Sequence, residues 1–204
     1  MHEASTAGHL AEPTSTGLNH RKLLMWAFLG SECMLFGTLI TAYLLYRGRS
    51  LVGPYPSEVL NIPFTTVSTF VLLTSSLAMV LALSAFQRGN LRWGKVWLLA
   101  TALLGIVFLL GQAYEFNQFA HEGLTPRTNL FGASFFTLTG LHGVHVTVGV
   151  IWLLSLFVVA LRGKLKKEQA MNVELAGLYW HFVDIVWIVI FTVVYLIGAT
   201  PTGG

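Results

Sequence analysis

Five side chains able to transfer protons or bind metal ions lie inside strongly apolar stretches of this sequence. They are Glu32 near the N-terminus, His142 and His145 in a later stretch, and His181 and Asp184 near the C-terminus. Ionisable groups in such surroundings are costly, and they usually pair with one another or mark a functional site. Such side chains can handle protons, bind a metal ion or haem, or hold helices together.

The spacing of these residues favours polar contacts between helices over ligation of a metal or haem. His142 and His145 are three residues apart, as are His181 and Asp184, so in a helix each pair shares one face. A histidine and an aspartate so placed can neutralise each other. Imidazole also suits iron, copper and zinc, but three histidines are too few for a cytochrome with two haems. We therefore predict a buried polar network and no metal site in this chain.

Glu32 is the strongest candidate for a proton-linked role. It lies roughly ten residues into its apolar stretch, which places it roughly 14 Å deep in a helix. A central charge there costs about 2.5–3.5 kcal/mol on insertion scales. The side chain is thus expected to be neutral or hydrogen-bonded, either as a link between helices or as a proton-handling group. Tyr114 and Glu115 close another apolar stretch, where we expect them to act as interfacial anchors.

The elements that position these residues are predicted to be transmembrane helices. The sequence is 54% hydrophobic and 10% charged, its mean hydropathy is +0.68, and each of five apolar stretches exceeds the roughly 18 residues needed to cross a bilayer. The fold class is therefore all-α, a five-helix membrane bundle. The expected division is a polar tail over 1–22, spans over about 23–46, 62–87, 93–117, 130–161 and 173–198, and an outer tail over 199–204.

The basic residues predict the orientation of the bundle. Nine Lys and Arg fall on one side of the predicted spans and three (Arg47, Arg49 and Arg127) on the other, which places the N-terminus in the cytoplasm and the C-terminus outside. The nine are Arg21, Lys22, Arg88, Arg92, Lys95, Arg162, Lys164, Lys166 and Lys167. Because they are spread over short loops, nucleic-acid binding is not expected. The single cysteine, Cys33, excludes an intrachain disulfide.

The sequence resembles subunit III of the haem-copper terminal oxidases, in the short five-helix bacterial form. The resemblance covers residues 20–198. It is carried by Gly30, Ser31 and Glu32, by Tyr114 and Glu115, by Phe135 and Phe136 followed by residues 139–146, and by residues 179–187.

This resemblance implies an accessory subunit of a proton-pumping oxidase in the bacterial inner membrane. The implied chain has no cofactor and is not catalytic by itself, although it is part of an oxidoreductase complex. Haems and copper would belong to partner subunits. The implied partners are subunit I by direct packing, subunit II, a small subunit IV, and phospholipid. Glu32 matches the family's buried carboxylate, to which a supporting role in proton uptake is ascribed.

Two other functions remain as alternatives. An accessory subunit of a nitric oxide reductase would share the superfamily, and its neighbouring genes would differ. An autonomous proton-coupled transporter using Glu32 and Asp184 is less favoured, because inverted repeats and interrupted helices are not evident.

Overall fold

The computed structural model describes residues 20–46, 62–165 and 169–197, and in these ranges every regular element is a helix. The helices are α1 (His20–Tyr46), α3 (Ile62–Gln87), α4 (Leu91–His121), α5 (Leu130–Leu161) and α6 (Ala170–Ile190), followed by a π-helical segment, η2 (Phe191–Leu196). Five segments are long and apolar enough to cross a membrane. The predicted all-α bundle of five spans is therefore confirmed. The orientation of its termini stays a prediction, as does the division into tails; residues 1–19 and 198–204 lie outside the described ranges.

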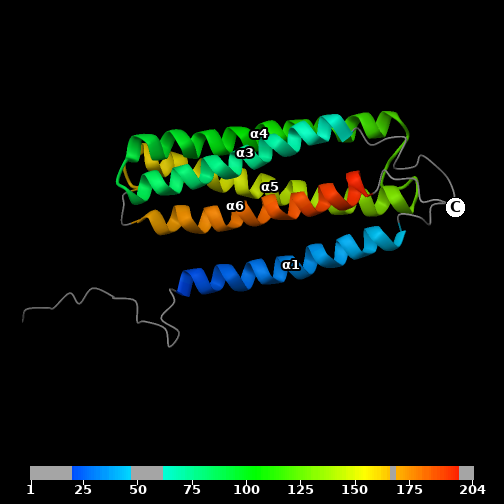
Figure 1. The fold of residues 1–204 in the computed structure, drawn as a ribbon, viewed down its shortest axis with the longest axis horizontal. Coiled ribbons are helices and arrows are strands. Elements are labelled where there is room, and N and C mark those ends of the chain that lie inside the picture. The colour runs from blue at the N-terminus through cyan, green and yellow to red at the C-terminus, as the bar shows by residue number, and fades with distance from the viewer. Residues whose placement is uncertain (1–19, 47–61, 166–168, 198–204) are drawn as a thin grey trace, which may run out of the picture.

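The helices run up and down alternately, as short connections require (Figure 1). Helices α3 and α4 form the most extensive pair, α5 packs on α4, and α6 packs on both α3 and α5. Helix α1 lies along the side of this group and contacts mainly α5 and α6. The basic residues of the described loops gather at the end where α4 and α6 begin, whereas Arg127 lies at the opposite end.

Local signals set the bounds of the central helices. The Asn90 side chain accepts a hydrogen bond from the Trp93 amide at the start of α4, and Asn129 does the same for Gly132 at the start of α5. These caps satisfy backbone donors that a helix leaves free at its N-terminus. Gly89 has a φ of 78° in the turn between α3 and α4, a conformation that strongly favours glycine.

Trp180 fixes the packing of α6 against three neighbours. Its ring is 1% exposed, and its indole N–H donates to Ser75 Oγ of α3 at 3.0 Å. A Cβ added at Gly105 of α4 would lie 2.6 Å from this ring, and one added at Gly149 of α5 would lie 2.9 Å from it. The two glycines thus leave room for the indole, as small residues commonly do between membrane helices.

Candidate functional site

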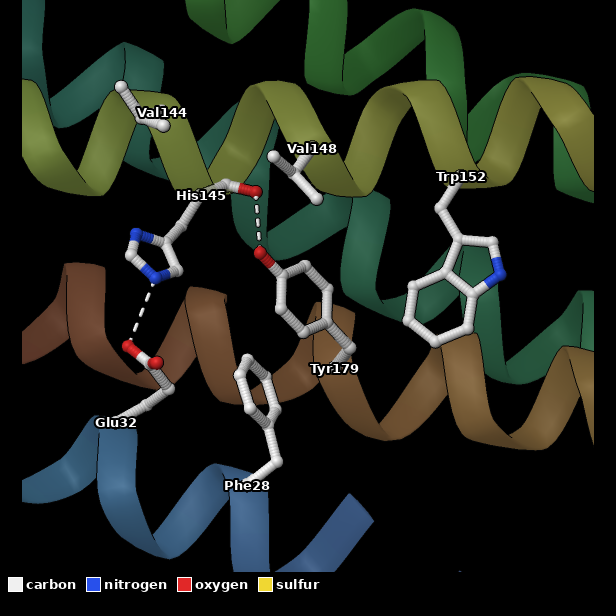
Figure 2. A pocket seen from close by; sticks show the side chains of 7 residues that line it. All are labelled: Phe28, Glu32, Val144, His145, Val148, Trp152 and Tyr179. Atoms are coloured by element: carbon white, nitrogen blue, oxygen red, sulfur yellow. Dashed lines mark hydrogen bonds and ion pairs between the residues drawn. The ribbon is translucent and has the colours of Figure 1, made fainter. Parts of the chain in front are cut away.

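Glu32 of α1 and His145 of α5 meet across the join between α1 and the rest of the bundle (Figure 2). The Glu32 carboxyl Oε2 lies 3.0 Å from His145 Nε2. The other ring nitrogen, Nδ1, lies 2.8 Å from the carbonyl oxygen of Leu141, and the Tyr179 hydroxyl of α6 donates to the carbonyl of His145 at 3.0 Å. Three helices therefore hold one carboxyl and one imidazole in direct contact.

The hydrogen bonds of His145 determine which atoms of this pair hold protons. A carbonyl oxygen has no hydrogen to give, so His145 Nδ1 has to be the donor to Leu141. Nε2 then either accepts a hydrogen bond from a protonated Glu32 or, when itself protonated, donates to a carboxylate. In both arrangements the two facing groups share one proton and have no net charge, which suits their place in the membrane. We call Glu32 and His145 the dyad.

The dyad opens onto a cleft of about 370 Å³. Its lining comes from α1, α5 and α6, and apart from the dyad it is mainly apolar and aromatic: Phe28, Val144, Val148, Trp152 and Tyr179. Figure 2 shows the Glu32 and His145 side chains pointing toward each other at one end of this group, with Trp152 at the other.

His142 does not join His145, although the two share a helix face in the sequence prediction. Its ring is 1% exposed and stacks on Trp187 at a centroid distance of 5.0 Å, with Phe36 and Phe108 edge-on to it. Neither ring nitrogen has a hydrogen-bond partner among the described residues. His142 therefore lies in an aromatic cage in the interior, and His145 alone reaches the cleft.

His181 and Asp184 contact a third residue between them rather than each other. The Ser76 hydroxyl of α3 lies 2.6 Å from His181 Nδ1 and also hydrogen-bonds to the buried Asp184 carboxyl. The Asp184 Oδ1 atom has no hydrogen-bond partner in the described part of the chain. The i, i+3 spacing of His181 and Asp184 predicts a direct pair. Spacing within one helix does not reveal Ser76, because that residue comes from another helix.

Glu115 lies in a second buried polar cluster, which sequence reasoning did not anticipate. Its carboxyl is 1% exposed, accepts a hydrogen bond from the Thr65 hydroxyl of α3, and accepts another from the Gln112 amide at 2.8 Å. The Tyr195 hydroxyl of η2 lies beside Thr65 and Glu115. The i, i+3 spacing of Gln112 and Glu115 was the available signal. Tyr114, by contrast, is exposed, and interfacial anchoring remains a prediction for both residues.

No group of three His, Cys, Asp or Glu side chains in the described ranges is arranged to hold a metal ion. The polar contacts described above instead join α1 to α5, α3 to α6, and α3 to α4. Fold and site together define a multi-pass α-helical membrane protein whose ionisable side chains lie at contacts between its helices.

Comparison with known proteins identifies the family. The family model described as cytochrome c oxidase subunit III matches residues 1–199. Cytochrome c oxidase subunit 3 of Bacillus sp. (strain PS3) is 40% identical over 173 residues, covering 85% of this chain and 84% of the relative. The probable quinol oxidase subunit 3 of Staphylococcus saprophyticus is 40% identical over 187 residues, or 91% and 92% of the two chains. Quinol oxidase subunit 3 of Bacillus subtilis is 37% identical over 173 residues, or 85% of each.

The chain belongs to the cytochrome c oxidase subunit III family. With its five apolar helices, it is a multi-pass protein of the bacterial plasma membrane.

Proposed function

We propose that this chain is the accessory, cofactor-free subunit III of a proton-pumping haem-copper respiratory oxidase that reduces oxygen to water. The observation that carries the proposal is the family match over residues 1–199. Haems and copper belong, on this proposal, to partner subunits. The electron donor is also set, on this proposal, by those partners. Relatives of equal identity are named for cytochrome c oxidase and for quinol oxidase, so this kind of subunit occurs with either donor.

The bundle is expected to pack directly on subunit I, within a complex that also contains subunit II and a small subunit IV. Large apolar side chains on the outer faces of α1, α3 and α4 support a lipid- and protein-facing surface, among them Met34, Phe70 and Leu110. We place the N-terminus in the cytoplasm on the distribution of basic residues. The cleft lined by Phe28, Trp152 and Tyr179 is the proposed place for a bound phospholipid, because its lining is mainly apolar and aromatic.

The dyad is the proposed contribution of this chain to proton uptake. Its shared proton can move between Glu32 and His145 without creating net charge in the membrane. The groups that reduce oxygen lie in another chain, so the dyad supports turnover and does not perform it.

Glu32→Gln tests this role. The glutamine amide can donate to His145 Nε2, so it preserves the contact between α1 and α5 while removing the exchangeable proton. We expect normal assembly and near-normal electron transfer, with proton uptake slowed or turnover-induced inactivation accelerated about two- to tenfold. This is well below the roughly 10²–10⁴-fold effect of a catalytic proton-transfer group, because the dyad supports turnover without performing it. Oxygen consumption and proton uptake by the purified complex in vesicles measure both effects.

The matched control is Cys33→Ser, because Cys33 is the next residue of α1 and is exposed. It should leave proton uptake and inactivation unchanged. A fully assembled Glu32→Gln complex that cannot reduce oxygen at all would contradict a supporting role, and unchanged proton uptake and durability would remove the dyad from the proposal.

A further inference from the structure

A second concave surface lies between the start of α4 and the end of α5. Its volume is about 270 Å³, and six residues line it: Arg92, Lys95, Val96, Leu99, Phe157 and Leu161. We call this surface the α4–α5 groove. No part of the dyad or of its cleft contributes to it.

The groove combines two cations with an apolar floor. Arg92, Lys95, Val96 and Leu99 follow one another at spacings of three, one and three, so they form one stripe along α4. Phe157 and Leu161 are four residues apart on α5 and complete the other wall. Both charges therefore stand near the start of α4. Val96, Leu99 and Phe157 extend from them toward the middle of the bundle, whereas Leu161 is the last residue of α5 and lies at the same helix end as the cations.

Among the residues that the structure describes, neither Arg92 nor Lys95 forms an ion pair with an acidic side chain. The segments that form the groove, 91–100 and 151–165, contain no Asp or Glu. The ion pairs found in the described ranges involve Lys22 with Glu174 and His145 with Glu32. Positive charge beside apolar surface is thus left for an external anion.

The depth of the cations matches that of phospholipid head groups. Trp93 follows Arg92 directly, is exposed, and stacks on Trp97. Exposed tryptophans collect where a membrane meets water, and basic pockets between helices at this depth bind phosphate-containing head groups.

We propose that the α4–α5 groove binds one anionic phospholipid. Its phosphate lies between Arg92 and Lys95, and one acyl chain lies along Val96, Leu99, Phe157 and Leu161. The lining of the Glu32 cleft contains a carboxyl and no Lys or Arg, so of these two sites the α4–α5 groove is the one expected to prefer an anionic head group. The inference stands independently of the proposed function.

Native mass spectrometry of the full chain, purified with its accompanying subunits and stripped of lipid in detergent, tests the site. The probe is phosphatidylglycerol, compared with phosphatidylcholine of the same acyl chains. In R92Q/K95Q, the phosphatidylglycerol concentration that half-fills one site should rise about tenfold. Phosphatidylcholine binding should be the same in the variant and the wild type.

Two further variants separate this site from general attraction. R88Q/K164Q removes the same net charge from the same end of the bundle without touching the groove lining, and it should leave phosphatidylglycerol binding unchanged. Leu99→Trp fills the apolar floor while keeping both cations, and it should lower occupancy. Equal binding by wild type and R92Q/K95Q, as expected if a partner subunit covers the groove, would overturn the proposal. So would equal losses in the two double variants, or full occupancy in Leu99→Trp.

Discussion

Replacing Trp180 by alanine is expected to lower the free energy of unfolding by about 3 kcal/mol or more. The indole fills the space left by Gly105 and Gly149 and donates to Ser75, so its loss opens a cavity where α3, α4, α5 and α6 meet. Packing between membrane helices depends on such close contacts, because lipid supplies no hydrophobic drive for one helix to bind another. Unfolding of the purified chain in mixed micelles of dodecyl maltoside and SDS, followed by circular dichroism, measures the change.

Trp26→Ala is the matched control for this prediction. It removes the same side chain from α1, where Trp26 is 59% exposed, so it should change the unfolding midpoint little. Similar destabilisation by both substitutions would show that Trp180 has no special place in the packing. Trp180→Phe, which keeps most of the volume and loses the hydrogen bond, should fall between wild type and Trp180→Ala.

The second large effect is expected at Glu115. Glu115→Ala removes the acceptor of two buried donors, the Thr65 hydroxyl and the Gln112 amide. Because a buried polar group deprived of its partner costs about 1–3 kcal/mol, we expect a loss of about 2 kcal/mol or more, measured in the same assay. Glu115→Gln retains the shape and one acceptor oxygen, so it should recover most of this loss.

Glu122→Ala serves as the control, because the Glu122 side chain is exposed and, among the described residues, its carboxylate accepts a hydrogen bond only from the half-buried Gln118. The helix cap itself is made by the Glu122 backbone N–H, which the substitution keeps. It should cost little. If Glu115→Ala were as stable as Glu122→Ala, the buried cluster would have no part in holding α3 to α4.

The five helices could be predicted from the sequence because the constraint is simple. A bilayer requires long apolar segments with internally satisfied backbones, and each run in this chain exceeds the length needed. The predicted and observed helix ends differ by a few residues where a helix continues beyond its apolar run. Helix α4 continues to His121 beyond the predicted limit near 117, because polar residues such as Gln118 continue the helix after the apolar run ends.

The partners of the buried polar groups could not be predicted in the same way. Spacing places His142 and His145 on one face of α5. The small angle between them around the helix axis is nevertheless enough to put His142 in an aromatic cage and His145 at the cleft. The contacts of Glu32 with His145 and of Ser76 with His181 join residues more than 100 positions apart. Such contacts depend on how the helices are rotated and paired, which periodicity within one helix does not contain.

The measurement that tests the central claim most directly is the composition of the native complex purified by an affinity tag on this chain. From aerobically grown cells, in mild detergent, the chain should bring with it a haem-copper subunit I, identified by mass spectrometry and by a reduced-minus-oxidised haem spectrum, and the preparation should consume oxygen. Purification of the folded chain without any haem-copper subunit, or with haem bound to this chain alone, would contradict the account.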